Sequence, residues 1–175
     1  MKKFEFFLLL GLLCLCPKLS AQHMPTRVFP TPQEIEVTNQ PFISADFRIT
    51  GLKSVDSVAI SFLKEILPFG STKKAIPIKI SFLKDKQAEL QRSGAYRLKI
   101  TDKSISIEIK DDRSLFYAVQ TIKQLVSKTN DGKIKLYPCM ITDYPDVAYR
   151  GTVEGFYGTP WSFDDRIEQL RFYGK

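Results

Sequence analysis

The chain has 175 residues, of which 43% are apolar and 26% are charged, and its formal net charge is +7. This balance excludes an intrinsically disordered chain and allows one globular domain with a short remainder. The lysines and arginines are scattered over alternating positions and turns rather than gathered with stacking aromatic residues, so nucleic acid is not an expected partner.

The first residues, MKKFEFFLLLGLLCLCPKLSA, have the layout of a secretory signal peptide. Lys2 and Lys3 precede an apolar run from Phe6 to Cys16, and Leu19-Ser20-Ala21 supplies a small residue at the cleavage position. The run is about half as long as the roughly 20 apolar residues that cross a membrane, although an uncleaved anchor is the alternative. We therefore expect residues 1–21 to be removed and the mature chain to be exported, periplasmic or extracellular, without membrane contact.

Removal of residues 1–21 takes away three lysines and one glutamate, which leaves 175 − 21 = 154 residues with a net charge of 7 − 2 = +5. Cys139 is then the one remaining thiol, so no internal disulfide forms and a buried core cysteine is expected. His23 is the only histidine in the sequence, so zinc sites and histidine-assisted nucleophiles lack their usual residues. We expect no metal and no other cofactor.

The middle of the chain predicts strands alternating with two helices. Polar and apolar residues alternate over 34–38, which indicates a strand. Residues 54–67 predict an amphipathic helix that Ser54 opens and that Pro68 and Gly70 close. Its apolar face would consist of Val55, Val58, Ala59, Phe62, Leu63, Ile66 and Leu67.

Apolar residues at period two predict further strands over 76–82, 96–100 and 105–109, the last two joined as a hairpin. A second helix follows and ends near Val126, and the turn Asn130-Asp131-Gly132 then leads into a strand over 134–137.

Asp111 and Asp112 stand at the start of the second helix and might suggest an acid/base pair. They directly precede Arg113 at a helix start, where carboxylates satisfy free N–H groups and interact favourably with the helix dipole. We interpret them as helix caps.

Strands with one polar and one apolar face, together with two amphipathic helices, predict an α+β fold. We expect a mixed or antiparallel sheet with both helices on one face. The elements are expected to end near residue 138, within a domain that spans residues 22–145. Because no catalytic group is evident in it, this domain would support another part of the protein.

The segment YRGTVEGFYGTPWSFDDRIEQL, residues 149–170, differs from everything before it. Tyr149 to Val153 predicts a short strand, and Ser162 predicts an N-cap with Asp165 as its capping-box partner. A strand, an aromatic loop and a helix in succession are typical of the first βα unit of a parallel barrel, where ligands bind at the carboxyl ends of the strands. A loop whose aromatic residues only pack is the alternative.

The run DYPDVAYRGTVEGFYGTPWSFDDR resembles the junction of glycoside hydrolase family 84, the N-acetyl-β-glucosaminidases and O-GlcNAcases. In that family an N-terminal α/β domain precedes a (β/α)8 catalytic barrel, so residues 146–175 would be the start of a truncated barrel. The preceding domain, with YRLKI and AVQTIKQL, is similar to the non-catalytic domain found also before family 20 hexosaminidase barrels. Family 20 barrels open with Arg-Gly followed by Asp and a further Arg, and RGTVEGFYG therefore favours family 84.

The resemblance implies the N-terminal portion of an exported β-N-acetylglucosaminidase, which hydrolyses terminal β-linked N-acetylglucosamine with retention. The substrate's own 2-acetamido group attacks the anomeric carbon, an exception to the scheme with two protein carboxylates. The family's two neighbouring catalytic aspartates lie on a later strand, so this chain is assigned no catalytic residue and is expected to be inactive by itself. Asp164 and Asp165 are interpreted as caps of their helix.

Gly155 and Tyr157 match positions that bind the sugar in the family, the glycine through its main-chain carbonyl. Arg150, Glu154 and Trp161 match the motif as well but receive no role. The implied partner is a glycan or glycoprotein that contains N-acetylglucosamine. A family 20 hexosaminidase and a non-enzymatic glycan-binding or structural remnant remain alternatives.

Residues 146–175 offer too little apolar surface to offset the entropy lost when about 30 residues become ordered. We therefore expect residues 22–145 to fold without them.

Overall fold

The structure is a computed structural model of the chain, and it describes residues 28–51, 56–153, 155 and 158–173. The expected signal peptide at residues 1–21 lies outside this range, as do His23, Ser54 and Tyr157.

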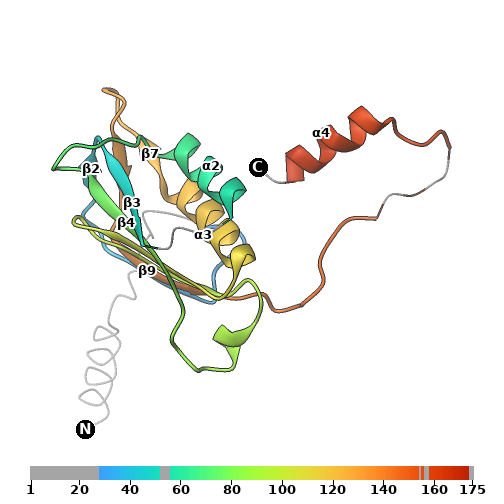
Figure 1. The fold of residues 1–175 in the computed structure, drawn as a ribbon, viewed down its shortest axis with the longest axis horizontal. Helices are drawn as coiled ribbons and strands as arrows, with labels where there is room; N and C mark the ends of the chain where they lie inside the picture. The colour runs from blue at the N-terminus through green and yellow to red at the C-terminus, as the bar shows by residue number, and fades with distance from the viewer. Residues whose placement is uncertain (1–27, 52–55, 154, 156–157, 174–175) are drawn as a thin grey trace, which may run out of the picture.

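A six-stranded mixed sheet forms the centre of the fold, in the order β1-β9-β5-β6-β4-β3 (Figure 1). The β3–β4 and β4–β6 pairs are parallel, and the remaining pairs are antiparallel. The strands are β1 Glu34–Val37, β3 Phe47–Gly51, β4 Ile76–Phe82, β5 Tyr96–Ile100, β6 Ile105–Ile109 and β9 Cys139–Asp143. The predicted mixed sheet and the predicted β5–β6 hairpin are confirmed.

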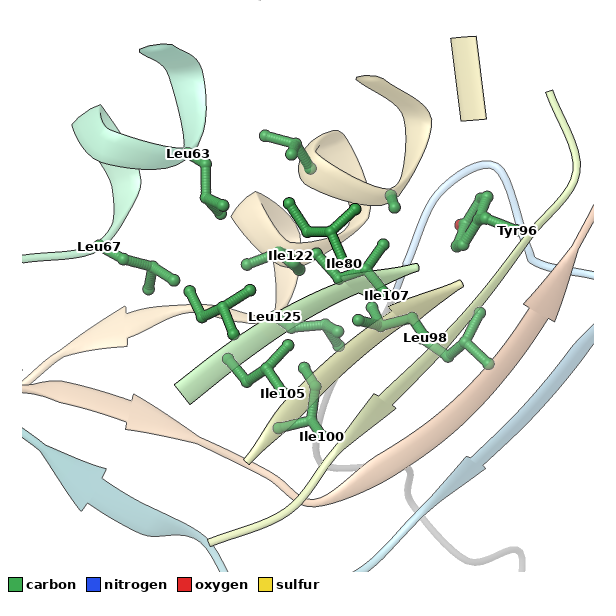
Figure 2. Close-up of a cluster of buried hydrophobic side chains, with 14 of the residues drawn as sticks. Leu63, Leu67, Ile80, Tyr96, Leu98, Ile100, Ile105, Ile107, Ile122 and Leu125 are labelled. Atoms are coloured by element: carbon green, nitrogen blue, oxygen red, sulfur yellow. The ribbon is translucent and has the colours of Figure 1, made fainter. Parts of the chain in front are cut away.

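Two helices cover one face of this sheet, α2 (Ser57–Ile66) and α3 (Asp112–Leu125). Figure 2 shows Leu63 and Leu67 from the α2 region and Ile122 and Leu125 from α3 directed at the aliphatic side chains of the strands. This arrangement is the predicted α+β fold.

Smaller elements complete the domain. A three-stranded antiparallel sheet has the order β2-β8-β7, and one 3-10 turn, η1, lies between β4 and β5. Their bounds are β2 Phe42–Ser44, η1 Glu89–Gln91, β7 Ser127–Lys128 and β8 Ile134–Leu136.

The core follows from the alternation along the central strands. Ile107 of β6 lies between Leu98 of β5 and Ile80 of β4 in the sheet register, and all three side chains are fully buried beneath the helices. Neighbouring positions point to the other face, where Arg97 forms ion pairs with Asp85 at 3.0 Å and with Glu108 at 3.7 Å. One face is therefore apolar and covered, and the other is charged and solvated.

The start of α3 confirms the capping interpretation of Asp111. Its Oδ1 accepts hydrogen bonds from the Ser114 backbone nitrogen and the Gly94 backbone nitrogen, each at 3.1 Å, and its Oδ2 accepts one from Ser93 Oγ at 2.6 Å. Ser114 completes a capping box. One carboxylate thus caps the helix and ties it to the loop before β5.

The start of α2 differs from the prediction. Asp56 is the N-cap, and its side chain accepts a hydrogen bond from the Val58 backbone nitrogen at 2.8 Å. With the helix beginning at Ser57, Ala59 and Leu63 face the core, whereas Val58 points outward and is 55% exposed. The predicted start at Ser54 and the predicted burial of Val58 are therefore wrong, because the nearer carboxylate supplies the cap.

Strand β9 was not predicted, and the expected end of the elements near residue 138 is too early. Strand β9 lies between β1 and β5, and its Ile141 is fully buried opposite Leu98. The five residues CMITD show only a brief alternation, so the strand is defined by its partners rather than by its own pattern.

The predicted strand over Tyr149 to Val153 does not form, since these residues have no regular secondary structure. Both end residues are 96% exposed. A single strand without a neighbour leaves its backbone groups unpaired by other strands and gains little stability. The start of a barrel therefore remains a proposal.

Replacement of Ile107 by alanine should lower the free energy of unfolding by about 2–5 kcal/mol, because the central strand loses buried contacts and a cavity remains. Urea unfolding monitored by circular dichroism measures this change. Ile43→Ala is the matched control, since Ile43 is 57% exposed. Equal losses for the two variants would contradict this account of the core.

A pH dependence should follow from Asp111. Burial raises the pKa of this carboxyl, but hydrogen bonds from Ser93, Ser114 and Gly94 together bring it below the usual value. A pKa depressed by folding contributes stability above the unfolded value of about 3.9, and this contribution disappears as the pH falls through the folded value. Asparagine also caps helices well. Asp111→Asn should therefore lose less stability than the native chain between neutral pH and pH values below about 3.9.

Urea unfolding at a series of pH values measures this difference. Asp112→Asn removes a carboxylate from the same turn and leaves the capping box intact, so it separates the loss of one charge from the loss of the cap. An Asp111→Asn profile parallel to that of the native chain would disprove the assignment.

Candidate functional site

The glycine- and aromatic-rich loop, residues 151–161, carries both residues that the sequence assigned to sugar binding. Gly155 is described and exposed, with its backbone accessible from solvent. Tyr157 lies outside the described residues, together with Glu154 and Phe156. The structure therefore places one of the two expected binding residues.

The helix after this loop, α4 (Phe163–Tyr173), forms where the sequence predicted it and lies apart from the sheet and its two helices (Figure 1). Ser162 Oγ accepts a hydrogen bond from the Asp165 backbone nitrogen at 3.2 Å, and Asp165 Oδ2 accepts one from the Ser162 backbone nitrogen at 3.1 Å. This is the predicted capping box. None of the helix's described side chains is buried, so local capping rather than packing defines it.

A cavity of about 360 Å³ lies between the loop and α4. Gly155 and Trp161 both line it, which brings together two positions of the motif that are six residues apart. Trp161 is 49% exposed and supplies a flat apolar wall. The remaining lining residues are Thr152, Val153, Arg166, Gln169 and Leu170.

The chemistry of this cavity suits a polyhydroxylated ligand. An indole presents a flat apolar surface to a ring, while an amide and a guanidinium supply hydrogen-bond donors. Gly155 has no side chain, so a ligand can approach its main chain closely. The lining therefore combines a flat apolar surface with hydrogen-bond donors.

Three carboxylates of the described chain, Asp111, Asp143 and Asp165, make structural contacts. Asp165 caps α4 and Asp111 caps α3, so neither is free to act as an acid/base group. Asp143, at the end of β9, accepts a hydrogen bond from the Gln33 backbone nitrogen at 3.3 Å. Burial raises its pKa above the usual value. No sequence signal marked Asp143, because its burial depends on a strand that was not predicted.

Tyr96 and Cys139 are equally unsuited to nucleophilic catalysis. The Tyr96 hydroxyl shares a hydrogen bond of 2.6 Å with Thr121 Oγ1, and burial raises its pKa above the usual value. Burial also raises the pKa of the Cys139 thiol to about 12. The thiol is free and buried, as the sequence predicted, and stays protonated at neutral pH.

Within residues 28–51, 56–153, 155 and 158–173, no three His, Cys, Asp or Glu side chains are grouped so that they could hold a metal ion. The same part of the chain contains no helix of sufficient length and apolar character to cross a membrane.

Two family models match the chain in succession. Residues 25–144 match glycosyl hydrolase family 20, domain 2, and residues 150–175 match NAGidase, beta-N-acetylglucosaminidase. The first match ends at residue 144, just after β9, and the second begins at residue 150.

Individual relatives agree with these matches. N,N'-diacetylchitobiase of Vibrio harveyi is 30% identical over 139 residues, which are 77% of this chain and 15% of the relative. The structure of CpGH84B is similar with a TM-score of 0.68 and 27% identity, covering 85% of this chain and 28% of that one. A glycoside hydrolase family 20 beta-N-acetylglucosaminidase has a TM-score of 0.52 and 27% identity, covering 72% and 24% respectively. The chain thus spans between 15% and 28% of the length of these relatives.

Proposed function

The chain belongs to the glycosyl hydrolase family 20, domain 2 family through residues 25–144, and on that premise we propose that it is the N-terminal portion of a β-N-acetylglucosaminidase. In this proposal residues 22–145 form a non-catalytic domain, and residues 146–175 are the start of a (β/α)8 catalytic barrel. Residues 149–153 would become its first strand only beside the neighbouring strands of the complete protein. The observation that carries the proposal is the match of residues 150–175 to a β-N-acetylglucosaminidase model directly after the domain.

The proposed reaction is retaining, substrate-assisted hydrolysis of terminal β-linked N-acetylglucosamine. Gly155 and Tyr157 would bind the sugar, and Trp161 would provide a wall of the same site. The shared cavity of Gly155 and Trp161 supports this placement. The resemblance to family 84 implies two neighbouring aspartates on a later strand, one of which would be the acid/base group while the other would orient the 2-acetamido group. Asp111 and Asp165 are helix caps and take neither role in this proposal.

We favour an enzyme like those of family 84. The motif RGTVEGFYG supports it, and so does the similarity to CpGH84B, which covers 85% of this chain. This share is about 149 residues (0.85 × 175) and exceeds the 120 residues from 25 to 144, so it includes residues outside the family 20 match. A family 20 hexosaminidase is the second candidate, because the domain itself matches that family.

The proposal is tested with an aryl N-acetyl-β-glucosaminide as substrate. The complete protein should hydrolyse it, whereas residues 22–175 alone should not, since general acid/base catalysis typically contributes 10²–10⁴ in rate and its groups are missing. No turnover by the complete protein, or turnover by the short chain, would refute the proposal.

Within the complete protein, Tyr157→Ala should reduce kcat/KM by the equivalent of about 2–3 kcal/mol, because a buried polar contact and its packing are lost. Tyr149→Ala is the matched control, since Tyr149 belongs to the same segment and is 96% exposed. Steady-state kinetics measure both. Equal effects of the two substitutions would remove Tyr157 from the sugar site.

Export is part of the same proposal and rests on the sequence of residues 1–21. Secreted protein should begin at Gln22, because Leu19-Ser20-Ala21 has the small residues that precede a cleavage site. N-terminal sequencing of the exported protein determines this. A chain that still begins at Met1 would contradict cleavage.

A further inference from the structure

The segment that leaves the domain, residues 144–150, is held by side chains from several other parts of the fold. The Arg92 guanidinium lies over the Tyr144 ring, 5.1 Å from its centroid, and Arg92 Nη1 donates a hydrogen bond to the Pro145 carbonyl at 3.3 Å. Gln33 Nε2 donates to Asp146 Oδ1 at 2.9 Å. The path of the chain after β9 is therefore fixed by contacts with the loop after η1 and with the segment before β1.

Arg150 makes the last of these anchoring contacts along the chain, within a segment, residues 146–153, that is exposed throughout. Its guanidinium lies 5.2 Å from the centroid of the Tyr117 ring, and its Nη2 donates a hydrogen bond to Tyr117 Oη at 3.0 Å. Tyr117 thus uses both its ring face and its hydroxyl for one cation. Residues 151–153, which follow directly, are exposed.

An acidic side chain, Asp143, lies near the contact between Arg150 and Tyr117. Arg150 and Asp143 line one cavity of about 200 Å³, together with Tyr117. Burial is the main influence on the Asp143 carboxyl and raises its pKa, whereas the positive charge of Arg150 lowers it. The two side chains are therefore within electrostatic reach of one another.

A glycine, Gly94, lies directly against the Tyr117 ring. Gly94 has a φ of +88°, and a Cβ at this position would lie 2.7 Å from Tyr117 Cε2 and 3.2 Å from Pro145 Cγ. Only glycine combines this φ with such close contacts without strain. The Tyr117 ring is held on its inner side by Gly94 and offers a partner to Arg150.

From these contacts we infer that Tyr117 and Arg150 form a joint that fixes the start of the glycine- and aromatic-rich loop to the α/β domain. Tyr117, a residue of the non-catalytic domain, is thereby a positioning residue for Gly155, five residues after Arg150. The enzymatic part of this inference rests on the proposed function, whereas the joint itself does not.

The joint is tested first on residues 22–175 with trypsin. Cleavage after Arg150 requires its side chain to leave Tyr117, whereas Arg166 and Arg171 lie in a helix without buried side chains. Tyr117→Ala should speed cleavage after Arg150 about tenfold and leave the other two rates unchanged, since opening of the joint is local. Tyr117→Phe keeps the ring face and should have a smaller effect.

Tyr137→Ala is the matched control, because Tyr137 also lies beneath a cation, Lys135, but at another part of the domain. It should leave cleavage after Arg150 unchanged. Urea unfolding of each variant identifies loss of the whole fold, which would accelerate all cuts equally. Cleavage after Arg150 at the native rate in folded Tyr117→Ala would overturn the joint.

The second arm uses the complete protein and an aryl N-acetyl-β-glucosaminide. Tyr117→Ala should raise KM about tenfold and change kcat by less than about threefold, because a displaced loop weakens ground-state and transition-state binding alike. Tyr117→Phe should recover part of the lost affinity. An unchanged KM with accelerated cleavage after Arg150 would retain the joint and reject its positioning role. Absence of native activity would refute the proposed function and leave the trypsin result as the test of the joint.

Discussion

Burial of one face of the six-stranded sheet beneath α2 and α3 is the constraint on which the other features depend. Ile107 and its neighbours Leu98 and Ile80 are fully buried there, and their positions fix the register of the three central strands. The same burial sets the orientation of α3, because its inner residues pack on these strands. Tyr117, on a less buried part of α3, is consequently held at a defined place beside the exit of the chain.

Much of this domain can be predicted from local patterns. The alternation in β4, β5 and β6 is strict, and Asp111 precedes the apolar residues of α3 at capping distance, so local sequence patterns suffice for these elements. The start of α2 was placed at Ser54 instead, because two capping residues, Ser54 and Asp56, stand close together before its apolar residues. Strands β3 and β9 are different, because their partners are distant in sequence and each has a weak pattern of its own. The predicted strand at Tyr149 to Val153 fails for the same reason, since strand pairing needs a neighbour.

The candidate site also has one part that the sequence predicted and one part that it did not. Gly155 and Trp161 were singled out by a motif, and the structure places both on one cavity. The contact between Tyr117 and Arg150 joins residues that are 33 apart in the sequence, and no local sequence pattern predicts it. An arginine in a segment without regular secondary structure and a tyrosine on a helix are both ordinary. Their relation becomes visible only once the sheet has brought the end of β9 next to α3.

In the proposed enzyme, residues 22–145 fold and position the loop that follows, this loop binds the sugar, and the acid/base groups lie on a later strand of the complete protein. The proposed hydrolysis of a β-linked N-acetylglucosaminide proceeds with retention of configuration at the anomeric carbon. Proton NMR of the complete protein acting on an aryl N-acetyl-β-glucosaminide tests it most directly, because the anomeric proton of the first sugar released reports the stereochemistry. The account predicts that the β-anomer appears first and then mutarotates. Initial release of the α-anomer would contradict it.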